Sequence, residues 1–269
     1  MPVWIDTHVH LDDPAFDADR GTVLAAACAA GVKRMVNVGY RPIAWKTTLA
    51  LAERHPDIAF TLGLHPGHAD EFSAATLDAL SGLVESTPVV AIGEIGLDFS
   101  RGGPPRALQE DAVRQQLRLA LAAGLPAVIH QRQAEVEILT VFASEPALPP
   151  LILHSFDGSV RYADFAIEHG CLVGVGGLAT RQGSSALREV LARIPAGQVV
   201  LETDAPFLVP AGVRGGRNTP ASVALIGQRM ANLWTVDVPE FSAMTTKTAA
   251  DAFGLVDACP LIDLGGSSG

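Results

Sequence analysis

The chain has 269 residues, with 19 basic and 29 acidic side chains and a formal net charge of −10. This excess of acid argues against nonspecific nucleic-acid binding by a basic surface. Apolar residues make up 48%, which fits a globular protein with a full core, and no apolar stretch is long enough to span a bilayer.

The cysteines indicate the compartment. Cys28, Cys171 and Cys259 are widely spaced and odd in number, which favours reduced thiols over a disulfide framework. The first expected strand begins at Val3 and leaves no room for a signal peptide before it. We therefore expect a cytoplasmic protein without a membrane partner, and a monomer.

Short apolar, β-branched runs alternate with helical patterns along the chain. Strands are expected at residues 3–7, 34–38, 59–63, 89–93, 127–130, 151–154, 172–175 and 199–202. Helical patterns end at Gly31, Gly124 and Gly170, where glycine is a common helix stop, and two further helices are expected at 219–233 and 239–253.

This alternation predicts an α/β fold with a parallel sheet, and eight strands predict a closed (β/α)₈ TIM barrel in a single domain. The barrel domain is expected at residues 1–257 and a disordered tail at 258–269. An open doubly wound sheet is the alternative, but no G-x-G-x-x-G follows the first strand.

Metal-ligand residue types recur where the expected strands end. Along a strand, side chains at i and i+2 point to the same face, so His8 and His10 in the run VWIDTHVH can face one cation. The later strands carry the remaining candidates, which are His65, Glu94, His130, His154 and Asp204. In a barrel all these positions lie at one mouth, where active sites of this fold form.

The number of candidate ligands suggests how many cations they bind. Four imidazoles and two carboxylates, with His65 set aside, are too many for one cation that keeps an open position. They suit two divalent cations that share a carboxylate, roughly 3.5–4 Å apart. An imidazole-rich set favours zinc, manganese, iron or nickel over magnesium.

The chain resembles the TatD family of metal-dependent deoxyribonucleases, within the amidohydrolase-like metallohydrolases. The resemblance rests on seven runs between Ile5 and Phe253, namely IDTHVHLD, GLHPGHA, AIGEIGLDF, LPAVIHQR, LILHSFDGS, IPAGQVVLETDAPFL and RGGRNTPA. The chain departs from the usual family pattern at Gln131, Ser155 and Thr248, none of which removes a metal ligand.

The resemblance implies a TIM barrel with two divalent cations, with zinc, manganese, magnesium or nickel as candidates. One cation would be bound by His8, His10, Glu94 and Asp204, and the other by Glu94, His130 and His154. Glu94 would bridge the two cations, and His65 would line the substrate site without binding metal.

The leading hypothesis is a deoxyribonuclease of the 3′–5′ exonuclease type, which cleaves DNA phosphodiester bonds with a metal-activated water. Asp204 would accept the proton of that water or orient it. His65 and Arg132 would bind substrate and stabilise the charge that develops on the phosphate. Arg101, Arg181, Arg214 and Arg217 also follow strands, although Arg217 is better interpreted as a loop anchor.

A second enzyme class is compatible with the same ligand pattern. An amidohydrolase would cleave a C–N, lactone or aminoacyl-ester bond of a small molecule or of tRNA. Many such enzymes bridge their metals with a carboxylated lysine, whereas here Glu94 stands at the fourth strand. A metal-binding scaffold without activity is the least favoured alternative, because the ligands and the loop motifs occur together.

Three further carboxylates are interpreted from the sequence, two of them in two ways. Asp6 either orients a ligand histidine or ends the first strand. Asp98 either fixes a turn or touches substrate, and Glu202 is interpreted as an ion-pair partner of an arginine.

Overall fold

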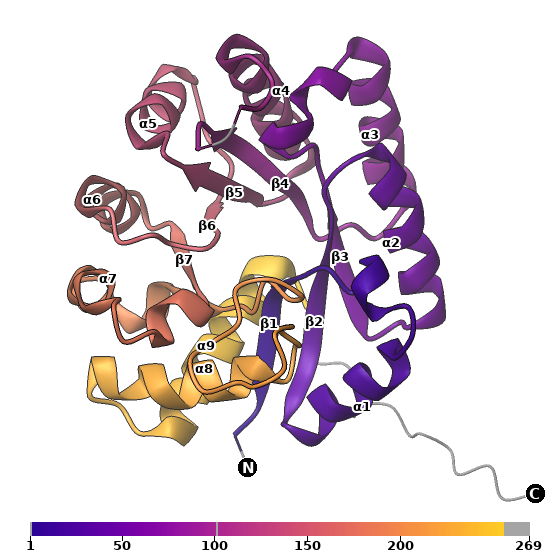
Figure 1. The fold of residues 1–269 in the computed structure, drawn as a ribbon. Coiled ribbons are helices and arrows are strands. Elements are labelled where there is room, and N and C mark those ends of the chain that lie inside the picture. The colour runs from indigo at the N-terminus through magenta and orange to yellow at the C-terminus, as the bar shows by residue number, and fades with distance from the viewer. Residues whose placement is uncertain (1, 101, 256–269) are drawn as a thin grey trace, which may run out of the picture.

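Eight parallel strands form a barrel with helices around its outside (Figure 1). The computed structural model describes residues 2–100 and 102–255. The strands, which follow one another around the sheet in chain order, are β1 (Trp4–Val9), β2 (Val32–Gly39), β3 (Ile58–Leu62), β4 (Ala91–Asp98), β5 (Ala127–Arg132), β6 (Leu151–Leu153), β7 (Leu172–Val175) and β8 (Val199–Leu201).

The last strand returns to the first. Val9 and Ala205 form a parallel bridge, and the backbone N–H of Asp204 donates to the carbonyl oxygen of His8 over 2.9 Å. Neighbouring strands are parallel throughout the described sheet. The predicted (β/α)₈ barrel is therefore confirmed, and the open doubly wound alternative is wrong.

Helices connect the strands and cover the outer face of the barrel. They are α1 (Arg20–Ala29), α2 (Pro42–Arg54), α3 (Ala74–Ser86), α4 (Arg106–Ala123), α5 (Glu135–Ser144), α6 (Val160–His169), α7 (Ser185–Leu191), α8 (Ser222–Met230) and α9 (Val238–Phe253). Gly124 and Gly170 end α4 and α6 in the left-handed conformation that glycine adopts without strain, as predicted. None of the described helices has the length and apolar character needed to cross a bilayer.

Four strands, β1, β2, β4 and β5, end later than predicted, and in two of them this changes where a candidate ligand lies. β1 continues to Val9 and β4 to Asp98, so His8 and Glu94 lie inside strands instead of after them. Both side chains are buried, so a polar residue does not mark the end of the strand here. The pairing of β4 with β5 shifts register between Ile92 and Ile95, around Glu94.

The end of the barrel opposite the polar mouth is packed with apolar side chains. A cluster of buried residues joins six strands to α9, and it consists of Ile5, Val36, Ala91, Val128, Ile152, Val200, Ala249 and Phe253. The larger cluster includes strand residues and residues of the surrounding helices, among them Trp4, Tyr162 and Phe241. The predicted tail at 258–269 lies outside the described residues.

Candidate metal centre

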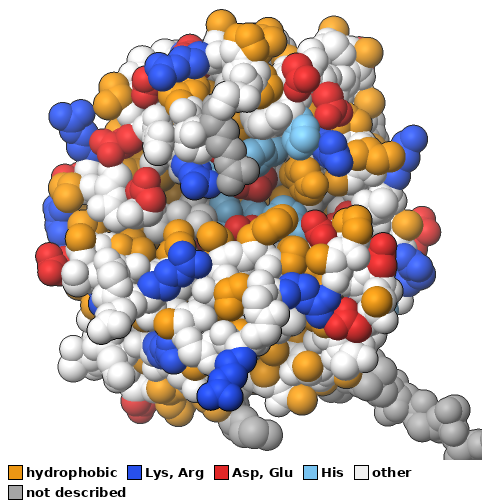
Figure 2. Space-filling model, in the orientation of Figure 1, with side chains coloured by type: hydrophobic (Ala, Val, Ile, Leu, Met, Phe, Trp, Pro, Cys, Tyr) orange, Lys and Arg blue, Asp and Glu red, His pale blue; other side chains and the backbone are white. Residues whose placement is uncertain are grey.

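A cavity of about 630 Å³ opens at the carboxyl ends of the strands. Figure 2 shows this hollow, with histidine and acidic side chains at its bottom and basic side chains near its rim. Its wall contains most residues that the sequence analysis singled out, which are His10, His65, Glu94, His130, His154, Asp204, Arg132 and Arg181. His8 is buried and contacts this set from β1.

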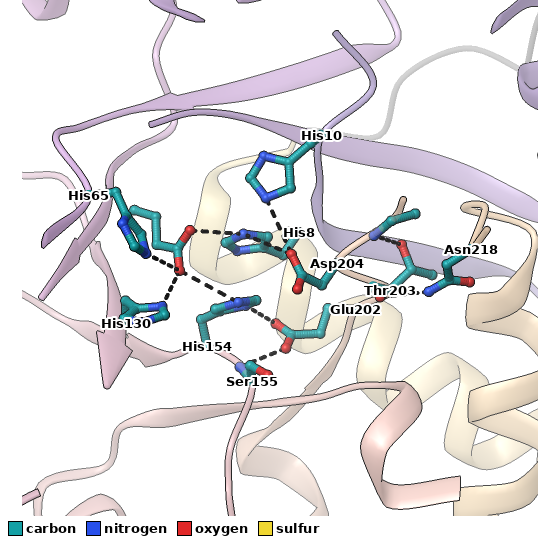
Figure 3. A network of polar contacts seen from close by, with 12 residues as sticks. His8, His10, His65, His130, His154, Ser155, Glu202, Thr203, Asp204 and Asn218 are labelled. Atoms are coloured by element: carbon teal, nitrogen blue, oxygen red, sulfur yellow. Dashed lines mark hydrogen bonds and ion pairs between the residues drawn. The ribbon is translucent and has the colours of Figure 1, made fainter. Parts of the chain in front are cut away.

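Glu94 contacts four imidazoles, those of His8, His65, His130 and His154. Figure 3 shows these four histidines close together. Its Oε1 atom is 2.6 Å from Nδ1 of His130 and 3.7 Å from Nε2 of His154. Its Oε2 atom is 3.5 Å from Nε2 of His8. The two carboxylate oxygens therefore face different histidines.

Asp204 faces the histidine pair of β1. Its Oδ1 atom is 3.2 Å from Nε2 of His10 and 3.9 Å from Nε2 of His8. The rings of His8 and His10 have centroids 5.2 Å apart, which agrees with the i, i+2 spacing on one strand face. Asp204 has a left-handed backbone with a φ of 53°, which is uncommon for a residue with a side chain.

Asp6 holds the segment before Asp204. Its Oδ1 accepts the backbone N–H of Thr203 over 2.9 Å, and its Oδ2 accepts the Thr203 hydroxyl over 2.6 Å. The Asn218 amide donates to the carbonyl oxygen of Thr203 over 2.8 Å. Asp6 therefore braces the segment after β8 against β1. From His8 it accepts the backbone N–H and contacts no ring nitrogen, and β1 continues past Asp6, so neither sequence interpretation of Asp6 describes it.

Two carboxylates contact the outer ring nitrogens of histidines. Glu202 is 3.0 Å from Nδ1 of His154 and accepts the backbone N–H of Ser155 over 2.7 Å. Asp98 is 3.3 Å from Nε2 of His130 and also accepts the backbone N–H of Ser100. Among the described residues Glu202 pairs with His154 and with no arginine, contrary to the prediction, because the segment that follows β8 directs this side chain to the segment that follows β6.

A carboxylate that contacts one ring nitrogen of a histidine fixes which nitrogen carries the proton and leaves the other nitrogen free to bind metal. With Nδ1 of His154 facing Glu202, Nε2 is the atom left toward Glu94. With Nε2 of His130 facing Asp98, Nδ1 is the atom left toward Glu94. Glu202 stands two residues before Asp204, and both follow the end of β8 at Leu201.

His65 differs from the other histidines. Its Nδ1 atom accepts the backbone N–H of Gly67 over 2.9 Å, so the ring proton sits on Nε2. Burial lowers the pKa of His65 to about 3, against the charge of Glu94, so the ring is neutral. Nε2 lies 3.9 Å from Oε1 of Glu94 and can donate a hydrogen bond into the cavity.

The donor set fits a bound cation. Both ring nitrogens of His8 and Nδ1 of His10 are buried without a hydrogen-bond partner among the described residues, and unpaired buried polar atoms cost free energy. Three groups have donor atoms within 4.8 Å of one another, and they are His8–His10–Asp204, His8–His154–Glu202 and His65–Glu94–His130. Imidazole and carboxylate are the usual ligands of catalytic divalent metals.

The carboxylates also make the site attractive to positive charge. Burial would lower the pKa of His154, but Glu202 and Glu94 raise it to about 10. Burial would also lower the pKa of His130, but the charge of Glu94 and the hydrogen bond with Asp98 raise it to about 9. The same field draws divalent cations, and their binding displaces protons from such ligands.

We expect Glu202→Gln to weaken metal binding by about 10- to 100-fold, because an amide holds the His154 ring less strongly than a carboxylate does. Gly174→Ala should act in the same direction. A Cβ at Gly174 would lie 2.3 Å from Oε2 of Glu202 and would displace that carboxylate.

Gly183→Ala is the matched control, since nothing lies within 4 Å of a Cβ at that position. Titration of metal into the stripped proteins by calorimetry measures the affinities. Wild-type affinity in both the Glu202 and the Gly174 variants would show that this carboxylate does not position His154 for metal.

The chain resembles known proteins along almost all of its length. The family model described as TatD related DNase matches residues 5–254. The chain is 37% identical over 259 residues to an Erwinia amylovora protein named 3′-5′ ssDNA/RNA exonuclease TatD, which covers 93% of this chain and 99% of the relative. It is 32% identical over 249 residues to the uncharacterized metal-dependent hydrolase YabD of Bacillus subtilis, which covers 92% and 98%.

A solved structure gives the same result. The crystal structure of YjjV, a TatD homolog from Escherichia coli K12, matches with a TM-score of 0.88 and 32% identity, over 93% of this chain and 98% of that chain. The family model, the relatives and the solved structure each span nearly the whole barrel. The chain therefore belongs to the TatD-related DNase family, as its motifs predicted.

Proposed function

We propose that the protein is a metal-dependent hydrolase that removes nucleotides from the 3′ end of single-stranded nucleic acid, with DNA as its principal substrate. The observation that carries this proposal is the joint location of the histidine–carboxylate set and Arg132 in one cavity. Membership of the TatD-related DNase family supports the same reaction.

We assign His8, His10, Glu94 and Asp204 to one divalent cation, and Glu94, His130 and His154 to a second. Such cations supply Lewis acidity, which acidifies water and offsets the charge on a phosphate. Zinc, manganese and nickel suit the imidazole ligands better than magnesium does. The first assignment is supported by Nε2 of His8, which has no hydrogen-bond partner among the described residues and faces Glu94 and Asp204.

Asp204 is assigned as the proton acceptor for the attacking water. Its carboxylate reaches the cavity from the end of β8, opposite Glu94, and the backbone around it is held by Asp6 and Asn218 through Thr203. A carboxylate held in this way accepts a proton without a change in its own position, which is the requirement for general-base work.

His65 and Arg132 are assigned to the substrate phosphate. Because Gly67 occupies Nδ1 of His65, Nε2–H is a donor directed into the cavity. The Arg132 side chain is exposed in the cavity wall and has no ion pair among the described residues. Its planar guanidinium can donate two parallel hydrogen bonds to a phosphate.

The remaining mouth arginines differ from one another. Arg181 lines the cavity and makes one long bond of 3.4 Å to the carbonyl oxygen of Val209, so it remains available to a phosphate. Arg217 pairs with Asp19 over 2.6 Å and lies over the ring of Phe16, which makes it a loop anchor.

The small-molecule amidohydrolase hypothesis predicts a lysine among the residues that line the cavity, because many such enzymes bridge their metals with a carboxylated lysine. None of the residues that line the main cavity is a lysine, so a carboxylated lysine has no place among the described groups there. A cytoplasmic location and a monomeric state remain proposals that rest on the sequence. The free thiols of Cys28 and Cys171 support the first of them.

The test is a substrate panel after each metal is restored to stripped protein. We expect a 5′-labelled single strand of DNA to shorten stepwise from its 3′ end, while amides, lactones and aminoacyl esters stay intact. Asp204→Ala protein purified in parallel controls for contaminating nuclease. Hydrolysis of an amide or lactone with the DNA strand left intact would overturn the proposal.

Measurement of DNA binding is the second test of the proposed function. Affinity of the metal-loaded Asp204→Ala protein for a single strand should fall as salt rises, because bound phosphates release counterions. Adding Arg132→Ala should reduce the slope of that dependence by about one. Salt-independent binding would argue against a polyanionic substrate.

A further inference from the structure

One aromatic side chain at the mouth is exposed without an evident structural reason. Phe207 is 52% exposed, although burial of a phenylalanine ring stabilises a protein. The other large apolar side chains that are exposed in the described chain lie on helices α2, α4, α5 and α6, and they are Ile43, Leu108, Leu121, Val136, Val160 and Ile167. Only the phenylalanine in this set lines the main cavity.

The backbone holds Phe207 in place while its ring stays accessible. The N–H of Phe207 donates to the carbonyl oxygen of Asp204 over 2.8 Å, and the N–H of Asn218 donates to Pro206 over 3.1 Å. The ring is therefore presented from a hydrogen-bonded turn that begins at the proposed general base.

The ring also lies beside the proposed metal ligands. Its centroid is 5.8 Å from that of His10, with 66° between the ring planes. Such an edge contact leaves ring surface free for another planar group. A substrate whose phosphate is held at the metal centre therefore has this aromatic surface within reach of its next chemical group.

The surrounding wall combines apolar and cationic groups. Leu178 and Leu208 line the cavity together with Phe207, and Arg132 and Arg181 line it as well. Figure 2 shows apolar side chains at the border of the hollow. Phosphate-binding arginines together with an exposed aromatic ring are the combination by which proteins hold single-stranded nucleic acid.

We propose that Phe207 stacks on a base next to the phosphate bound at the metal centre, so that the site selects unpaired strand ends over base-free phosphodiesters. This inference rests on the proposed nuclease function and adds the group that is recognised. Stacking tolerates any base, because every base has a π face. A duplex end would have to unpair its terminal base before the base could reach the ring.

The test combines a substitution in the protein with the removal of one base from the DNA strand. Phe207→Ala is compared with wild type on thymidine oligonucleotides that are intact or lack a base at one of the last three 3′ positions. We expect Phe207→Ala to raise the KM for the intact strand by roughly 5- to 100-fold. On the strand that lacks the stacked base, the two proteins should have similar KM values.

Three further measurements separate stacking from general damage. Phe207→Trp should keep a KM close to the wild-type value, since indole also stacks, and Phe207→Leu should behave as alanine does. Val136→Ala, at a position 56% exposed on α5, is the matched control and should change nothing. Metal content, measured in each variant, should stay the same, because the ring ligates no metal.

The possible failures are distinguishable. If wild type cleaves intact and base-free strands equally well and Phe207→Ala has an unchanged KM, the stacking role is overturned while the nuclease function stands. An equal rise of KM on intact and base-free strands would likewise overturn it. If wild type neither binds nor cleaves any oligonucleotide, the proposed function fails and this inference fails with it.

Discussion

Replacing Glu94 by alanine will empty the metal centre and lower hydrolysis by at least about 10³-fold, while the barrel stays folded. Glu94 faces His8, His130 and His154 from the middle of the site. Its loss removes the shared ligand of both proposed cations and the main negative charge that attracts them. The packed apolar end of the barrel lies away from this residue and is not disturbed by the change.

Metal content and stability measure this outcome together. Wild type should gain about 2.7 kcal/mol in free energy of unfolding when metal is present at a hundred times its Kd, whereas Glu94→Ala should gain nothing. Glu145→Gln is the matched control, because Glu145 is also a buried carboxylate but pairs with Arg114 and Arg118 away from the mouth. Two bound metals and wild-type turnover in Glu94→Ala would contradict the assignment of the bridge.

Asp204→Asn is expected to lower kcat by about 10²- to 10⁴-fold. The amide keeps the size of the side chain but accepts no proton, and it is a poorer ligand than a carboxylate. Because the ion pairs of Asp204 among the described residues are with His10 and His8, whereas His130 pairs with Glu94, we expect one cation to be lost and the other to remain.

Elemental analysis and steady-state kinetics distinguish the two roles of Asp204. The metal-to-protein ratio should fall from two to one, and excess metal should restore occupancy without restoring kcat. Asp157→Asn is a suitable control, since this cavity carboxylate accepts bonds from Gln131 and Ser159 and contacts no imidazole among the described residues. Turnover close to wild type in Asp204→Asn would rule out its role as the base.

The barrel is predictable because its strands are short apolar runs separated by helical segments. The strand expected at 172–175 coincides with β7, and the one expected at 127–130 begins where β5 begins. The hydrophobic period and the residues that end each helix or strand are local properties of a chain, so they can be recognised in a sequence. The ends of β1 and β4 were harder to predict, because His8 and Glu94 are polar residues inside strands.

The joint position of the ligands follows from the barrel alone, since the carboxyl ends of all strands meet at one mouth. The hydrogen bonds that hold the ligands and their neighbouring segments in place come from residues that are distant in the sequence. Glu202 reaches His154 across 48 positions, and Asp6 reaches Thr203 across 197. No local sequence pattern shows which carboxylate contacts the ring of which histidine. Phe207 was not singled out for a similar reason, because an exposed aromatic residue and a buried one look alike in a sequence.

The seam between β1 and β8 ties activity to the completion of the chain. His8 and His10 are synthesised long before Asp204 and before Ser242, whose hydroxyl accepts the N–H of Val3. The barrel can close only after α9 has left the ribosome, because contacts across this seam join residues more than 190 positions apart. A half-made or truncated chain would therefore hold half a metal centre and remain inactive.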